Sequence, residues 1–94
     1  MPICFIENVT SNQSAIEQIN SSIFGISATL YSNDKNKIYE MGKDLEVGVV
    51  GGNRWGFAPG VPYSPRKRSG KGNSFSIDSF SNVTRSQSLK GYFL

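Results

Sequence analysis

The sequence predicts an α/β fold, and three observations lead to that prediction. Short apolar stretches typical of strands alternate with amphipathic helical stretches over residues 1–52, in the order strand, helix, strand, helix, strand. Hydroxyl or acidic residues suited to N-caps precede each helical stretch, and glycines follow it. Each helix lies between two strands as a crossover connection would, which favours a parallel sheet.

The first strand and helix are expected within residues 3–25. Residues 3–9 (ICFIENV) have the composition of a largely buried strand. Thr10 or Ser11 offers an N-cap hydroxyl for the helix, and residues 14–17 (SAIE) have capping-box spacing that gives a second start. Gly25 is expected to end this helix. Its apolar face is formed by residues spaced three to four apart, namely Ala15, Ile16, Ile19 and Ile23.

The second strand and helix follow directly. Residues 26–31 (ISATLY) alternate apolar and small polar side chains and are expected to form a strand. Residues 32–34 (SND) form an N-cap cluster, with Asp34 near the positive end of the helix dipole. The buried stripe of this helix is expected to comprise Ile38, Met41 and Leu45, with Gly48 after its end and a short strand at residues 49–50.

The chain divides into three parts. Residues 1–52 form the α/β core, residues 53–72 form a long loop rich in glycine and proline, and residues 73–94 hold a terminal helix and strand. A loop of about twenty residues in a small domain is usually functional or disordered. The terminal helix is expected at residues 73–82, followed by a C-terminal strand of the kind used in oligomer contacts.

Composition excludes several classes of function. The 94 residues include one cysteine and no histidine, which excludes histidine-activated nucleophiles, an internal disulfide and a Cys/His zinc site. We therefore expect no metal site. The single cysteine favours a reducing compartment. The N-terminus lacks the pattern of a signal peptide, and the apolar runs are too short for a membrane span, so we expect a cytoplasmic protein that does not enter membranes.

Charge is distributed unevenly and suggests a second function. Residues 1–46 hold three lysines against six acids, a net −3, whereas residues 47–94 hold seven basic residues against one acid, a net +6. A basic half with aromatic residues in it could bind nucleic acid or another anionic partner, centred on residues 66–68 (RKR) and Lys71. The alternative is a solvated loop beside an unrelated fold.

Three stretches in order point to a known family. Residues 20–28 (NSSIFGISA) are similar to an Asn-x-x-x-Tyr-Gly-Leu-x-Ala pattern, and residues 45–53 (LEVGVVGGN) to Leu-Glu-x-Gly-x-Val-x-x-Asn. Residues 62–70 (PYSPRKRSG) are similar to Pro-Phe-Gly-Gly-x-Lys-x-Ser-Gly. In motifs and spacing the chain resembles the aldehyde dehydrogenase superfamily, in particular the C-terminal part of its catalytic domain. Residues 48–54 (GVVGGNR) look most like the corresponding run of semialdehyde dehydrogenases.

The resemblance implies two candidate site segments. The first is a substrate-access loop, in which an arginine could pair with a substrate carboxylate, and it comprises Asn53, Arg54, Trp55 and Phe57. The aromatics could equally serve only to pack the loop. The second is a motif loop beside the substrate tunnel, comprising Pro62, Tyr63, Lys67, Ser69 and Gly70. Residues 64–65 (SP) and 72–74 (GNS) depart from the family pattern, and a proline cannot adopt the backbone conformations that a glycine allows at its position.

The resemblance also implies what this chain does not carry. Pro2 matches the proline of a Glu-x-Phe-Gly-Pro motif, so the family's catalytic cysteine, its general-base glutamate and its dinucleotide-binding domain would lie upstream of Met1. We expect Cys4 to be a buried structural residue, and no catalytic or cofactor-binding residue in this chain. NAD or NADP is implied for a complete member only.

The expected protein is therefore a fragment or subunit of an NAD(P)-dependent aldehyde dehydrogenase that is inactive alone. Its expected partners are further copies of itself or a complementing N-terminal part, and an aldehyde is its substrate only in a complete enzyme. A fragment that cannot hold its fold is the third hypothesis.

Overall fold

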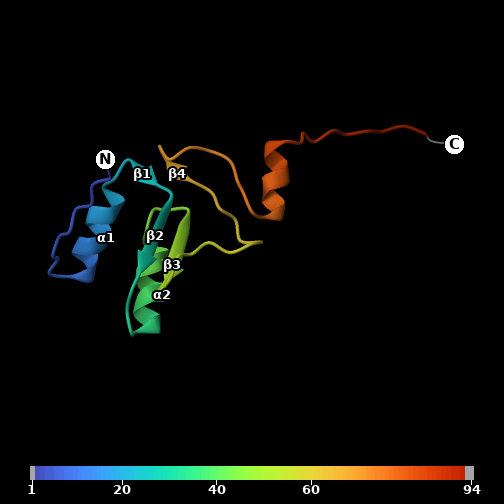
Figure 1. Cartoon of the computed structure of the whole chain (residues 1–94). Helices are drawn as coiled ribbons and strands as arrows, with labels where there is room; N and C mark the ends of the chain where they lie inside the picture. The colour runs from blue at the N-terminus through green and yellow to red at the C-terminus, as the bar shows by residue number, and fades with distance from the viewer. Residues whose placement is uncertain (1, 93–94) are drawn as a thin grey trace.

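The computed structural model describes residues 2–92 and contains a parallel strand pair with a crossover helix (Figure 1). Strand β2 (Ser27–Leu30) pairs in parallel with β3 (Val49–Gly52), with Ser27 opposite Val49 and Leu30 opposite Gly52. Helix α2 (Lys35–Lys43) connects the two strands. The predicted α/β class and the parallel pairing are both confirmed.

Helix α1 (Asn12–Asn20) begins where a serine cap predicts it. The Ser11 hydroxyl accepts a hydrogen bond from the Ser14 amide at 3.1 Å, so the earlier of the two expected starts is used. The expected end was wrong, because the helix stops at Asn20 with Ser21 as its C-cap. Gly25 instead lies in a strand, and Ile23 lies outside the helix with 54% of its surface exposed.

The cap of α2 is Asp34, as expected. Its carboxylate accepts hydrogen bonds from the backbone amides of Asn36, at 2.9 Å, and Lys37, at 3.2 Å. The negative charge also suits the positive end of the helix dipole. Ile38 and Met41 are half-buried, and Leu45, two residues past the helix, is only 3% exposed. The predicted buried stripe is thus confirmed in part, because its fully buried member lies past the end of α2 and no residue within α2 is buried.

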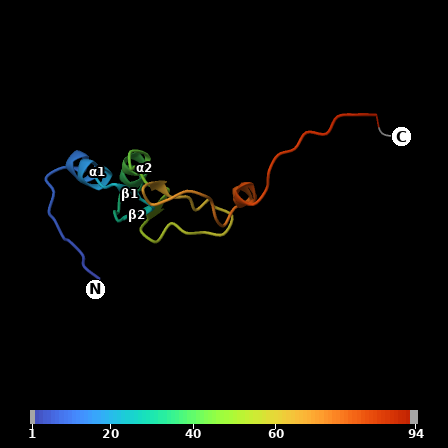
Figure 2. The same cartoon turned by 90° about the horizontal axis from the view of Figure 1, so that it is seen from above.

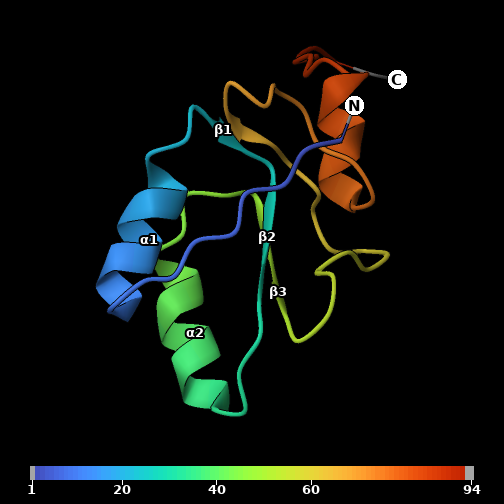
Figure 3. The ribbon, with the colours of Figure 1, turned by 60° about the vertical axis from the view of Figure 1, so that its left-hand side comes forward.

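The core is small and lies between the helices and the strand pair. Figure 2 and Figure 3 show α1 and α2 on the same side of β2 and β3. Ile16 of α1 meets Leu45 and Val47 there. The partly buried residues packed against this cluster are Ala28, Leu30, Met41 and Val50.

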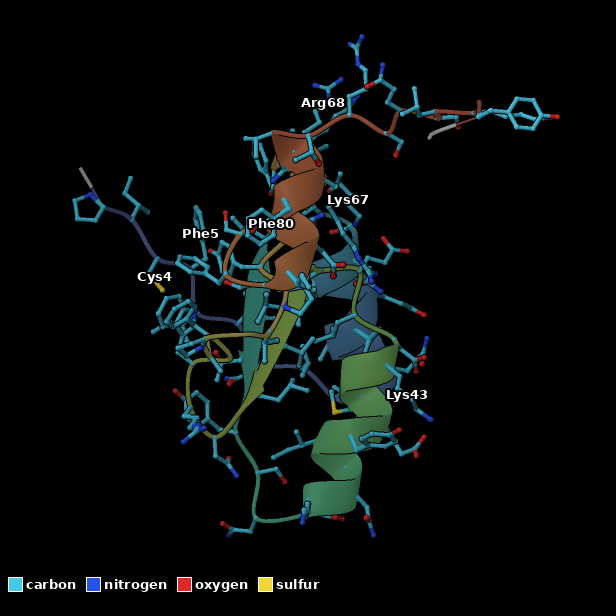
Figure 4. All side chains as sticks on the ribbon, turned by 90° about the vertical axis from the view of Figure 1, so that its right-hand side faces the viewer. Cys4, Phe5, Lys43, Lys67, Arg68 and Phe80 are labelled. Carbon is cyan, nitrogen blue, oxygen red and sulfur yellow. The ribbon has the colours of Figure 1, made fainter. Side chains whose placement is uncertain are left out.

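Residues 3–9 do not form the predicted buried strand. They have no regular secondary structure, and Ile3, Phe5 and Ile6 are 73%, 87% and 92% exposed. Cys4 is also exposed, so the expectation of a buried cysteine was wrong (Figure 4). A strand needs a neighbour to take its backbone hydrogen bonds, and among residues 2–92 no segment pairs with this one.

A second strand pair was not predicted. Strand β1 (Phe24–Gly25) pairs antiparallel with β4 (Arg66–Lys67), with Phe24 opposite Lys67. The predicted terminal helix appears as a shorter 3₁₀ helix, η1 (Ile77–Asn82), whose cap is Ser76. The loop expected over residues 53–72 is therefore partly ordered by β4.

The expected C-terminal strand is absent from residues 83–92, which have no regular structure and are exposed; the last two residues of that prediction lie outside the described part of the chain. Within the described part of the chain, residues 2–9 and 83–92 extend away from the α/β unit (Figure 2). The radius of gyration is 18.4 Å, against about 13 Å for a compact domain of similar length. Within the described residues, no helix is long and apolar enough to cross a membrane.

Candidate functional site

The predicted access loop starts from a firm anchor at Asn53. The Asn53 amide donates to the Leu30 carbonyl at 2.7 Å, which continues the strand ladder by one bond. The Asn53 side chain accepts from the Ser32 amide at 2.9 Å and donates to the Ser32 carbonyl at 3.0 Å. Its φ of 58° is left-handed, a conformation that asparagine tolerates better than most residues. Asn53 therefore fixes the start of the loop to the end of β2.

The aromatic residues of the loop pack on one another. Trp55 stacks on Phe57 with ring centroids 5.1 Å apart, and Phe57 meets Phe75 edge-on at 4.6 Å. Tyr63 also meets Phe75 edge-on, with ring centroids 5.9 Å apart. Trp55 keeps 58% of its surface exposed, and Arg54 is exposed beside it. Phe75 was not among the predicted site residues, since only the fold brings it to the loop.

The motif loop is pressed against the α/β unit at Gly48. A Cβ built on Gly48 would lie 1.5 Å from the Ser64 carbonyl oxygen, so only glycine fits this contact. Tyr63 and Ser74 exchange two backbone hydrogen bonds of 3.0 Å, and the Ser64 hydroxyl donates to the Gly72 carbonyl at 3.0 Å. The loop is thus held both to the unit and to the segment before η1.

Gly70 and Pro62 complete the predicted motif residues. Gly70 has φ +123°, a backbone conformation that side chains disfavour, and Pro62 is exposed. Beside Tyr63 and Pro65 an open cavity of about 570 Å³ is bordered by Lys71 and Asn82.

Among the predicted site residues, Lys67 makes the most numerous polar contacts through its side chain. Its ammonium donates to the Asn20 carbonyl at 2.6 Å and to the Ser22 carbonyl at 3.1 Å, and it pairs with the Glu46 carboxylate at 2.6 Å. Its neighbours dock as well, since the Arg68 amide donates to the Ile23 carbonyl at 2.9 Å. The Ser69 hydroxyl accepts from the Gly25 amide at 2.8 Å.

Asn20, whose carbonyl accepts from Lys67, also binds the segment between α2 and β3 through its side chain. Its side-chain amide donates to the Asp44 carbonyl, and its side-chain oxygen accepts from the Glu46 amide, both at 2.8 Å. Asn20, Glu46 and Lys67 come one each from the three stretches that carry the family resemblance. Asn20 and Glu46 were not predicted as site residues, although their places in those motifs were the available signal.

We expect Asn53→Ala to lower the free energy of unfolding by about 1–3 kcal/mol, because it removes two side-chain hydrogen bonds and places alanine in a left-handed conformation. Urea unfolding followed by circular dichroism measures the effect. Asn53→Gly is the control, since glycine tolerates that φ and loses only the side-chain bonds, and its loss should be smaller. Unchanged midpoints for both variants would contradict the anchoring role of Asn53.

These elements define a portion of an α/β domain with a glycine- and proline-rich loop docked on its strand pair. Comparison with known proteins identifies its family. The model of the family described as "Aldehyde dehydrogenase family" matches residues 1–89, and the chain therefore belongs to the aldehyde dehydrogenase family.

Individual relatives agree with this assignment. The chain is 30% identical over 87 residues to a succinate-semialdehyde dehydrogenase of Paenarthrobacter nicotinovorans, covering 92% of this chain and 19% of the relative. A betaine aldehyde dehydrogenase of Staphylococcus aureus, solved in complex with NAD+, superposes with a TM-score of 0.73 at 28% identity, covering 81% of this chain and 15% of that chain. This chain spans about a fifth of the length of the curated relatives that it matches.

A third likeness shows the fold alone. An aldehyde dehydrogenase of Mycobacterium tuberculosis, complexed with NAD+, superposes with a TM-score of 0.78 at 24% identity, covering 89% of this chain and 18% of that chain. The family assignment does not favour the second hypothesis, a basic module for nucleic acid.

Proposed function

We propose that this chain supplies the C-terminal part of the catalytic domain of an NAD(P)-dependent aldehyde dehydrogenase, and that it acts on aldehydes only together with the rest of such a domain. The family match supports the assignment to this chemistry. The observation that carries the proposal is the cluster of Asn20, Glu46 and Lys67, in which the three resembling stretches meet. A loop built in this way is suited to shaping a site whose reacting groups lie on other segments.

The cofactor does not fit the residues of this chain. The glycine-rich run at residues 48–52 enters and forms β3 and does not open a helix, so it offers no helix N-terminus to a pyrophosphate. We therefore place NAD or NADP, the nucleophile and the general base outside these 94 residues. They would come from a longer polypeptide or from a separate complementing chain, and further copies of the chain could join the same assembly.

The substrate proposed is an aldehyde that carries a carboxylate. Arg54 is exposed at the start of the access loop, next to the Trp55–Phe57 stack. A guanidinium can hold a carboxylate through two parallel hydrogen bonds, and the aromatic faces can contact the aliphatic part of the substrate. The similarity to a succinate-semialdehyde dehydrogenase supports this class. We place the assembly in the cytoplasm, where a single unpaired cysteine stays reduced.

The test is a complementation assay that follows NAD(P)H formation. We expect no turnover of short aldehydes or semialdehydes by the purified chain, because it lacks the reacting groups. We expect turnover when the chain is combined with the Paenarthrobacter enzyme from which the region aligned with this chain has been removed. Arg54→Met is the arm that tests the substrate class, and it should weaken use of succinate semialdehyde more than that of an uncharged aldehyde.

Two results would overturn the proposal. One is turnover by the chain alone that survives Cys4→Ser, since the missing groups would then have been replaced within it. The other is a complementing body that binds the chain and yet gains no activity.

A further inference from the structure

The ammonium of Lys67 is fully occupied by groups that lie far away in the sequence. A lysine ammonium has three N–H donors, and here the three acceptors are the Asn20 carbonyl, the Ser22 carbonyl and the Glu46 carboxylate. Two of these acceptors are carbonyls at the C-terminal end of α1 and just past it. A cation placed there interacts favourably with the helix dipole. One side chain thus ties the motif loop to α1 and to the segment before β3.

The lysine of this pair is less exposed than the lysine of the Lys43–Glu40 pair, while the Glu46 side chain is 55% exposed. The Lys67 side chain is 25% exposed, whereas the Lys43 side chain, which pairs with Glu40 on α2, is 53% exposed. Charge-assisted hydrogen bonds gain strength as water is excluded from them. Lys67 is the last residue of β4 and has a left-handed φ of 55°, and the turn at residues 68–69 follows it directly.

The contacts of Lys67 also hold the far end of the segment that runs from the access loop through the motif loop. Asn53 fixes the start of this segment at Ser32, and the Lys67 contacts fix its end, four residues after Tyr63. Between these two anchors, contacts run from Tyr63 through Phe75 and Phe57 to Trp55. Displacement of the Lys67 end would therefore move Tyr63 and loosen the aromatic stack.

We propose that Lys67 is a positioning residue, whose ammonium holds the access loop in the conformation that presents Arg54 and Trp55 to a substrate. The consequence for catalysis rests on the proposed function, whereas the consequence for loop conformation does not. Lys67 touches no reacting atom in this role. It acts through the loop between Asn53 and Tyr63.

The test uses the full chain and the single tryptophan, Trp55, as its reporter. We expect Lys67→Met to shift the Trp55 emission to longer wavelength and to increase its quenching by acrylamide, because the stack on Phe57 opens. Amide exchange at Arg68, whose amide bonds the Ile23 carbonyl, should become about tenfold faster. Far-UV circular dichroism should remain close to that of the wild type.

Lys43→Met is the matched control, because it also removes a lysine that pairs with a glutamate. The Glu40 hydrogen bond and charge raise the pKa of Lys43, but this pair is exposed on α2, apart from Lys67 (Figure 4). Lys43→Met should leave both the Trp55 emission and the amide exchange at Arg68 unchanged. If Lys67→Met alters neither Trp55 emission nor Arg68 exchange, the proposal is wrong.

If the Lys67→Met variant loses its helical signal in far-UV circular dichroism, Glu46→Gln is the variant that tests the proposal. It retains the side-chain shape and removes one charge, so a smaller change in both reporters supports the proposal and no change overturns it. In the complemented enzyme, Lys67→Met should raise KM for the aldehyde while kcat stays close to that of the wild type. Failure of complementation would count against the proposed function alone, since the Trp55 and Arg68 measurements do not depend on activity.

Discussion

Gly48→Ala is expected to release the motif loop from the α/β unit. The new Cβ would lie 1.5 Å from the Ser64 carbonyl oxygen and 2.7 Å from its carbonyl carbon, and both are backbone atoms that cannot rotate away. We expect a loss of more than about 4 kcal/mol in the docking of the loop, about a thousandfold in its equilibrium. Amide exchange at Gly25 and Arg68 measures it, because their amides bond Ser69 and Ile23 across the docked interface.

Gly42→Ala is the control for this prediction. Its new Cβ would lie 3.3 Å from a methyl group of Val50, a side-chain atom that can shift. Alanine inside α2 also gains about 1 kcal/mol of helix propensity over glycine, so we expect nearly wild-type exchange. The contact between Gly48 and Ser64 would be disproved if Gly48→Ala exchanged as slowly as Gly42→Ala.

The sequence was most informative where the determinants are local. Ser11 and Asp34 cap α1 and α2 through hydrogen bonds to amides two or three residues away, so a short window holds the whole signal. The parallel pairing of β2 and β3 follows from the crossover between them, since such connections leave few arrangements open. Fold class and helix starts could therefore be predicted.

Prediction failed where a partner distant in sequence decides the structure. Residues 3–9 have the composition of a strand, but composition cannot supply the neighbouring strand that their backbone needs. Gly25 resembles a helix stop, yet it pairs with Arg66 about forty positions later. At Gly25 a Cβ would lie 2.5 Å from the Glu46 carbonyl oxygen, a close approach that no local pattern shows.

The same distinction between local determinants and partners distant in sequence applies to the candidate site. Resemblance identified Lys67 and Ser69 as motif residues, and both dock the motif loop on residues 20–25. Their partners could not be predicted, because the Asn20 and Ser22 carbonyls are backbone groups whose position only the fold determines. Asn53 was expected in the access loop, and its side chain anchors that loop to Ser32.

We expect most molecules of the Leu45→Ala variant to be unfolded at room temperature. Leu45 is 3% exposed and belongs to a core with only Ile16, Val47 and Val49 as its other buried apolar residues among residues 2–92. Truncating a buried leucine costs about 2–5 kcal/mol, because burial is lost and a cavity remains. A domain of ordinary size is stable by only about 5–15 kcal/mol, and a core this small places the chain at or below the lower end of that range.

The matched control is Leu89→Ala, which makes the same truncation at a residue that is 81% exposed. It should change the free energy of unfolding by less than about 0.5 kcal/mol, because no described contact buries the side chain. Thermal unfolding followed by circular dichroism separates the two variants. A cooperative transition for Leu45→Ala at the wild-type temperature would mean that the helices and strands do not depend on this core. The third hypothesis, a fragment that cannot hold its fold, predicts no cooperative transition even for the wild type.

A large effect of Leu89→Ala would instead show that residues 83–92 pack against a second copy or another partner in solution.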